Sequence, residues 1–245
     1  MQFEKEITRF APSPTGRIHL GHALSALFSQ KEAEKRNGKV LLRMENIDKA
    51  RCKTEYEAYI KEDLHWLGFD WNGAVRRQSD HMEDYQIALQ KLKEIGVLYP
   101  CFCSRGDILT EIENSSGAPH DGIMGPDGPT YPGTCRKLAR DLQNEGIASG
   151  KKYALRLDVR RAQDIVGIIS WLDADTGEIR AEPEIFGDIV LARKDIMTSY
   201  HLSCTVDDHI QGISLVTRAR DLALATHIHR LLQQFVLATF YLQFQ

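Results

Sequence analysis

The chain has 245 residues, of which 42% are hydrophobic and 27% are charged, a balance typical of globular proteins and not of disordered ones. Its 31 Lys and Arg against 34 Asp and Glu give a net charge of −3, which excludes a uniformly basic nucleic-acid coat. No apolar run approaches the roughly 18 residues of a membrane span, and the acidic N-terminus is unlike a signal peptide. Five cysteines, an odd number, argue against a disulfide framework. We expect a cytoplasmic chain with no membrane contact.

The first part of the chain alternates strand-like and helical patterns. Pro12 and Pro14 stop the first strand, because neither can donate to a sheet ladder, and Asn37-Gly38 ends the first helix. A strand, a turn, a helix and a second strand in this order favour a parallel sheet. The expected elements are a strand over 6–11, a helix over 21–36, a strand over 40–44, and helices over 54–67 and 80–95.

Glycine and proline crowd the stretch 101–135, where regular periodicity vanishes. We interpret it as a loop-rich insertion within one α/β domain that covers 1–245, and not as a linker between two domains. The patterns that follow predict strands over 153–157, 165–170, 186–192 and 213–217, and helices over 199–210 and 221–238.

The segment from Arg9 to His22 is the most informative part of the sequence. A strand leads into a proline-stiffened turn, and the turn opens a helix near Gly21. The unpaired N–H groups of a helix start form an anion site, with His19 and His22 beside it as donors. A nucleotide is the natural ligand for such a site.

A cluster of metal-ligating residues lies in the insertion. Cys101, Cys103 and Cys135, with Tyr131 four residues before the last of them, could supply three thiolates and a phenolate to a tetrahedral zinc ion. Such a closed site would be structural and would stabilise a segment with little core of its own. His120 is a possible substitute for the tyrosine. We interpret Cys52 and Cys204 as ordinary thiols.

Several motifs together resemble the class I aminoacyl-tRNA synthetases. Pro12–His22 resembles their HIGH motif in the form that the glutamyl branch uses, and the resemblance extends over nearly the whole chain. Further matching segments are Arg43–Asp48 followed by Arg51, Phe186–Asp195, Thr198–Leu202, Val206–Gly212 and Thr226–Leu232. The resemblance implies a Rossmann-like α/β catalytic domain with a zinc-binding insertion over 101–135.

The same resemblance implies the substrates and their binding residues. It gives Arg9, Phe10, Ala11, Pro12, Ser13, Glu45, Tyr200 and Arg218 to L-glutamate, and His19, Gly21 and His22 to ATP with Mg²⁺. Arginine forks suit the two carboxylates of glutamate, and Glu45 suits its ammonium. His19 and His22 are the expected catalytic pair. Asp207 and Asp208 would ordinarily be helix-face charges, but the resemblance implies that their region lies near the active site.

Within the glutamyl branch, the short chain is most similar to the glutamyl-Q tRNA(Asp) synthetases, which share the cysteine and tyrosine ligand set. The resemblance implies a monomer that transfers glutamate to the queuosine base of tRNA(Asp). The lysine-rich KMSKS-type loop of the class is expected some 20 residues after Thr226–Leu232, and no lysine follows Lys194, so we expect a chain truncated before that loop. Two alternatives stay open: an N-terminal fragment of a glutamyl-tRNA synthetase, and a non-catalytic paralogue that binds glutamate or tRNA.

Overall fold

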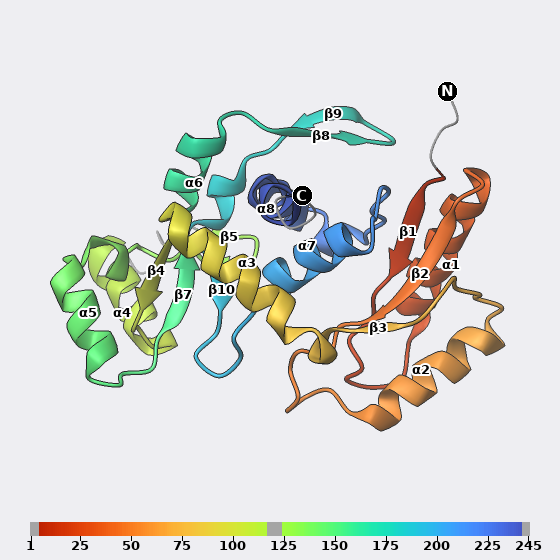
Figure 1. The fold of residues 1–245 in the computed structure, drawn as a ribbon, viewed down its shortest axis with the longest axis horizontal. Coiled ribbons are helices and arrows are strands. Elements are labelled where there is room, and N and C mark those ends of the chain that lie inside the picture. Colours follow the sequence, from red (N-terminus) through yellow and green to blue (C-terminus); the bar gives the residue numbers. More distant parts are fainter. Residues whose placement is uncertain (1–4, 117–123, 242–245) are drawn as a thin grey trace. The chain divides into compact units, whose positions relative to one another are not determined.

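The computed structural model describes residues 5–116 and 124–241. The chain divides into two compact units, one formed by residues 1–84 with 206–223 and the other by residues 85–205 with 224–245. Figure 1 shows the elements of both units in the colours of the sequence. The helices α3 (Met82–Ile95) and α7 (Tyr200–Ile210) each begin in one unit and end in the other.

The first unit is built on a parallel sheet. Its strands β1 (Ile7–Phe10), β2 (Lys39–Met44) and β3 (Arg76–Arg77) lie in the order β1-β2-β3. Both pairings are parallel, with Phe10 opposite Leu42 and Met44 opposite Arg77. The predicted strand–turn–helix–strand order is therefore confirmed, and the carboxyl ends of the strands meet at one edge.

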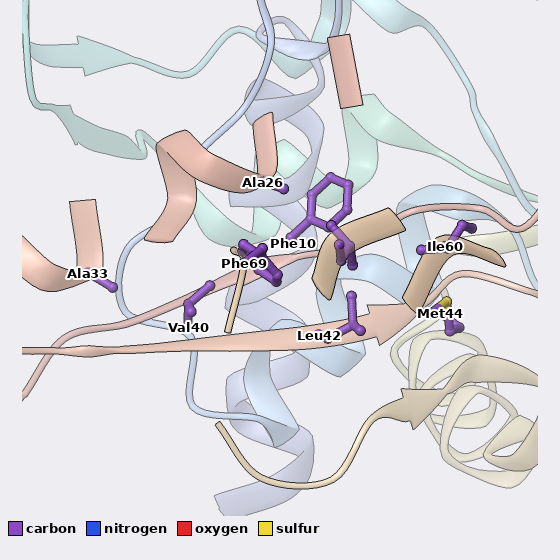
Figure 2. Packing of buried hydrophobic residues seen from close by; sticks show 9 residues of the cluster. Phe10, Ala26, Ala33, Val40, Leu42, Met44, Ile60 and Phe69 are labelled. Atoms are coloured by element: carbon purple, nitrogen blue, oxygen red, sulfur yellow. The ribbon is translucent and has the colours of Figure 1, made fainter. Parts of the chain in front are cut away.

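Two helices accompany this sheet, α1 (Leu20–Lys35) and α2 (Thr54–Trp66). α1 contacts β1 and β2, and it ends before Asn37, whose φ of 51° takes the backbone out of the helix as the sequence indicated. The core holds one continuous cluster that includes Phe10, Leu42 and Ile60 (Figure 2). Burial of these apolar side chains is the main stabilising contribution to the unit.

The second unit contains an antiparallel sheet in the order β10-β7-β4 and two small hairpins. Its strands are β4 (Leu98–Cys101), β5 (Met124–Gly125), β6 (Gly128–Pro129), β7 (Ala154–Leu157), β8 (Ser170–Asp173), β9 (Gly177–Arg180) and β10 (Val190–Ala192). Its helices are α4 (Arg105–Ser116), α5 (Arg140–Ala148), α6 (Val159–Val166) and α8 (Ala225–Tyr241), besides parts of α3 and α7. Short 3₁₀ turns occupy 78–80, 135–137, 183–186 and 220–222.

Three secondary-structure predictions were wrong. The strand expected over 165–170 is the end of α6 and the start of β8, because Gly167, with φ of 78°, ends the helix in the middle of the apolar run. The strand expected over 213–217 is irregular, because the backbone N–H groups of Ser214 and Leu215 converge on the single carbonyl of Ile7 and form no ladder. The stretch 101–135 is less loop-rich than predicted, since it contains α4.

No helix among residues 5–116 and 124–241 is both long enough and apolar enough to cross a membrane.

Candidate active site

The loop between β1 and α1 is fixed by backbone bonds to the segments that follow β2. The N–H of Glu45 donates to the carbonyl of Pro12 at 3.0 Å, and the N–H of Lys53 donates to the carbonyl of Pro14 at 3.1 Å. Proline supplies only an acceptor here, so these carbonyls are the groups through which the loop can be held. These bonds place the segment that includes Ser13 beside Glu45.

The two histidines lie together at the start of α1. His19 is the N-cap, and its Nδ1 accepts the N–H of Gly21 at 3.1 Å, while Nδ1 of His22 accepts the N–H of His19 at 3.4 Å. Their ring centroids are 3.9 Å apart. Because each Nδ1 is an acceptor, a neutral ring carries its proton on Nε2. Burial lowers the pKa of His22 from its ordinary value of 6.5, with the neighbouring His19 adding to the effect, so neutral pH favours that form.

Gly21 lies directly beside the ring of His19. A Cβ at this position would lie 3.0 Å from Cε1 of His19. The glycine therefore leaves room for the His19 ring to fold over the first turn of the helix, a role that the sequence did not reveal. The result is a helix N-terminus with two imidazole N–H donors, an arrangement suited to phosphate oxygens.

Arg9 lies at the carboxyl end of β1 and is held by two other segments. Its Nε and Nη2 donate to the two oxygens of Asp208 at 2.9 and 3.3 Å, and its Nη1 donates to the carbonyl of Thr217 at 3.1 Å. The residue is only 6% exposed. Burial alone would raise the pKa of Asp208, but Arg9 and Arg43 outweigh it and hold that pKa at about 2. The ion pair is therefore charged at neutral pH.

Arg43, on β2, is fully buried and joins this pair to Glu45. Its Nη1 donates to Asp208 at 2.7 Å and its Nη2 donates to Glu45 at 3.1 Å. Burial raises the pKa of Glu45 even though Arg43 and Arg9 act in the opposite direction. A ligand ammonium beside Glu45 would favour its ionised form, so the site is suited to a cation at this point.

The charged cluster continues to β3. Asp207 accepts from Nε of Arg76 at 2.8 Å and from the amide of Gln78 at 2.9 Å, and Nη2 of Arg76 donates to Asp84. Sequence analysis missed Arg43 and Arg76 as members of the site. It placed Asp207 and Asp208 only in a region near the active site and named no partner for either. Arg43 could have been found from the sequence, because it is a charged residue inside the apolar strand Val40–Met44. A buried strand contains a charged side chain only when that side chain has a partner of opposite charge.

Three further residues that were predicted to bind glutamate lie outside this charged cluster. Phe10 packs its ring against Phe69 at a centroid distance of 5.9 Å, so its side chain belongs to the core. Arg218 is half-buried and follows Thr217, whose hydroxyl bonds Ser29 of α1 at 2.6 Å. Tyr200 begins α7 in the second unit, where its ring lies 5.3 Å from that of His201.

The three cysteines of the insertion converge. The sulfurs of Cys101, Cys103 and Cys135 all lie within 4.8 Å of one another, and the last two are 3.4 Å apart. Sulfurs bound at about 2.3 Å around a tetrahedral zinc ion lie about 3.8 Å apart, so the spacing fits the metal. The hydroxyl of Tyr131 is 3.5 Å from Sγ of Cys103, and Nζ of Lys194 donates to the Cys103 carbonyl at 3.0 Å.

The protonation of this cluster depends on burial. Burial raises the pKa of the Cys103 thiol to about 11 and also raises the pKa of the Tyr131 hydroxyl. Zinc would favour the deprotonated ligands and so reverse these shifts. His120 lies outside the described residues. Cys52 is half-buried in the first unit and Cys204 is buried in α7, and neither belongs to the cysteine cluster.

Residues 6–244 match the family described as tRNA synthetases class I (E and Q), catalytic domain. The chain is 46% identical over 235 residues to the glutamyl-Q tRNA(Asp) synthetase of Rhodobacter capsulatus, covering 94% of this chain and 82% of that protein. It is 38% identical over 216 residues to the glutamate–tRNA ligase of Aquifex aeolicus, covering 87% of this chain and 43% of that one.

A solved glutamate tRNA ligase from Elizabethkingia meningosepticum, in complex with its amino acid, has a similar fold, with a TM-score of 0.78 and 26% identity. That similarity covers 95% of this chain and 47% of the ligase, so the chain spans less than half of the glutamate–tRNA ligases that it matches. The Rossmann-like α/β fold that the sequence predicted is thereby confirmed. The chain belongs to the family of class I tRNA synthetase catalytic domains of the glutamate and glutamine branch.

Proposed function

We propose that the chain activates L-glutamate with ATP and transfers it to the queuosine base of tRNA(Asp). The observation that carries the glutamate assignment is the buried cluster that joins Arg9, on β1, to Glu45, which directly follows the neighbouring parallel strand β2. Arg43 and Asp208 link the two residues. The cluster offers a cation and an anion side by side at the strand ends, as recognition of an amino acid requires. Queuosine is proposed as the acceptor because the chain is similar to the glutamyl-Q tRNA(Asp) synthetase of Rhodobacter capsulatus and covers 82% of that protein.

The reaction would run in two steps. A carboxylate oxygen of glutamate attacks the α-phosphorus of ATP, and pyrophosphate leaves with the β- and γ-phosphates. A hydroxyl of the queuosine ring then attacks the acyl carbon, loses its proton and expels AMP. His19, His22 and the start of α1 would stabilise the phosphate charge, and Mg²⁺ would enter with the nucleotide. Positioning and electrostatic stabilisation supply the catalysis, with no covalent enzyme intermediate.

The acceptor can be identified with labelled glutamate and four RNAs, one of which is tRNA(Glu). We expect label on tRNA(Asp) that contains queuosine and on its isolated anticodon stem-loop, and none on the same stem-loop with guanosine. The isolated stem-loop is the informative substrate because it has no acceptor end.

The result would be different for each alternative. Label at the 3′ end of tRNA(Glu) would identify a glutamate–tRNA ligase catalytic domain, the function of several relatives at 37–38% identity. Glutamate binding without transfer to any of these RNAs would contradict the proposed reaction and favour a non-catalytic paralogue.

We propose that Cys101, Cys103, Cys135 and Tyr131 hold one structural zinc ion. Purified chain should contain about one zinc ion per molecule, and Cys135→Ser should release it. The segment 101–135 should then become sensitive to protease while the first unit stays folded, because the metal stabilises its surroundings only locally. Metal analysis and limited proteolysis measure both effects.

Cys52→Ser is the matched control, since this thiol is half-buried and lies outside the cysteine cluster. It should keep its zinc. Absence of zinc from wild-type protein prepared without chelator would refute the site. Tyr131→Phe tests the fourth ligand separately, because it removes the phenolic oxygen and leaves the ring.

A further inference from the structure

Arg43 contacts both sides of the proposed amino-acid site without lying at its surface. It is fully buried, and its Nη1 and Nη2 donate to Asp208 and Glu45 at 2.7 and 3.1 Å. The guanidinium is planar and rigid, so the two carboxylates that it bonds are held at a fixed separation. Nη1 also donates to Gln211 at 3.0 Å, which restricts rotation of the group further.

Asp208 transfers this constraint to Arg9. Its Oδ1 accepts from both Arg43 and Arg9, at 2.7 and 2.9 Å, and its Oδ2 accepts from Nη2 of Arg9 at 3.3 Å. The carboxylate therefore meets the Nε/Nη2 side of the Arg9 guanidinium. Nη1 of Arg9 also donates to the Thr217 carbonyl at 3.1 Å. Because a guanidinium has five N–H donors on three nitrogens, these bonds do not use all of its donors, and a ligand carboxylate can add a bond at another edge.

We infer that Arg43 and Asp208 are positioning residues that set the distance and orientation between Arg9 and Glu45, and so determine selectivity for an amino acid with a suitably spaced carboxylate and ammonium. The inference rests on the proposed function. Neither residue needs to touch the substrate. Arg43 acts through Glu45 on the ammonium, and Asp208 acts through Arg9 on a carboxylate.

Rigid positioning has a large effect on recognition of this kind. Misplacement of a binding group by about 1 Å can cost about 100-fold in rate, and a site is accurate only when the groups behind it are fixed. Placing Arg43 and Asp208 inside the fold excludes water from the pairs and strengthens them. Loss of the Asp208 charge would leave Arg9 and Arg43 facing each other across a neutral amide.

The first experiment measures affinity for glutamate and for ATP by calorimetry on the full chain with Asp208→Asn. We expect glutamate affinity to fall about 10- to 100-fold and ATP affinity to stay within about twofold. Asp208→Glu keeps the charge but moves it by one methylene, so it should stay impaired. Recovery of wild-type glutamate affinity in Asp208→Glu, or wild-type affinity in Asp208→Asn, would overturn the positioning role.

Asp188→Asn is the matched control for buried charge. Asp188 is 4% exposed and accepts from Arg136 and Tyr99, but it belongs to the second unit. It should lower the thermal midpoint and leave glutamate affinity unchanged. A purely structural role of Asp208 would instead reduce the folded fraction, and with it the binding stoichiometry for both ligands equally.

Arg43→Lys tests the other connection and serves if Asp208→Asn does not fold. Lysine keeps the charge but lacks the fork that holds two carboxylates. Glutarate, which is glutamate without its ammonium, is the probe. We expect the ratio of glutamate to glutarate affinity to fall about tenfold in Arg43→Lys, because Glu45 is displaced. An unchanged ratio would overturn the assignment of Arg43.

If wild-type protein bound no glutamate, the proposed function itself would fail. Normal binding by every variant would overturn only the inference.

Discussion

Replacing Arg218 with alanine should lower the affinity for glutamate by about 30- to 1000-fold, which corresponds to about 2–4 kcal/mol. Its neighbour Thr217 bonds Arg9 through the carbonyl and Ser29 through the hydroxyl, so the backbone before Arg218 is tied to β1 and α1. A half-buried guanidinium on such a segment is well placed to meet a carboxylate. Without it, the carboxylate of glutamate would be desolvated with no cationic partner, which accounts for the size of the loss.

Calorimetric titration with glutamate is the measurement, with ATP as the second ligand. Arg220→Ala is the control, because Arg220 is exposed and lies two residues further along the same segment. It should leave glutamate affinity within about twofold. Arg218→Lys should recover part of the affinity through its charge, but not the part that requires a two-pronged contact. Glutamate affinity of Arg218→Ala within twofold of wild type would remove Arg218 from the site.

The sequence was sufficient for those parts of the fold in which local preference and burial agree. The strands 6–11 and 40–44 and the helix between them were predicted to within a few residues, because proline, Asn37-Gly38 and apolar spacing all mark the same boundaries. The order of these elements then predicted parallel pairing, which the register of Phe10 with Leu42 confirms.

The errors occurred where a single residue or a distant contact decides the structure. In the run around 165–170 the exposed Ile168 looks like strand core in the sequence, but Gly167 separates a helix from a hairpin. The segment 213–217 does lie against β1, yet both of its amides bond one carbonyl, which no local pattern could indicate. α4 was missed because it carries little amphipathic signal and has exposed positions such as Leu109.

The candidate site shows the same division. His19 and His22 could be named from the sequence because a helix start with two imidazoles suits nucleotide chemistry. Arg9 and Glu45 could be named because they stand at positions that match the motifs of the class I synthetases. The groups behind them could not, since Asp208 lies 199 residues from Arg9 and 165 from Arg43. These ion pairs join Asp208, near the end of α7, to residues of β1 and β2, and only the folded chain brings them together. A list of charged residues on a predicted helix does not distinguish them from surface charges.

The imidazole pair at the start of α1 should have the largest effect on the rate of adenylate formation. His19→Asn is the sharper variant, because asparagine is itself a good N-cap and can accept the Gly21 N–H in place of Nδ1. The helix should therefore stay intact while the Nε2–H donor is lost. Removal of one preorganised donor typically costs about 10²–10³ in rate. Glutamate-dependent pyrophosphate exchange measures it, and a rate within threefold of wild type would contradict the catalytic role.

The same pair predicts a pH profile that can be traced to one ring. The pKa of His22 lies below its ordinary value of 6.5. When the pH is above this pKa, the ring is neutral, Nδ1 accepts the His19 N–H and Nε2 carries the proton. As pH falls through the pKa, Nδ1 takes a proton and can no longer accept this bond, and the start of α1 loses part of its cap. We therefore expect adenylate formation to decline on the acid side in wild-type protein.

His22→Asn separates this cause from titration of the substrates. The asparagine oxygen can accept the His19 N–H at any pH, and the side chain has no proton to gain in this range. The variant should be slower than wild type at neutral pH, but its rate should not show the acid-side decline that His22 produces. Titration of ATP or glutamate would affect both proteins alike. An acid-side decline of the same shape in wild type and His22→Asn would therefore assign the decline to the substrates. A limb that is lost together with the imidazole would instead place the decline at the bond between His22 and the His19 backbone, where the helix begins.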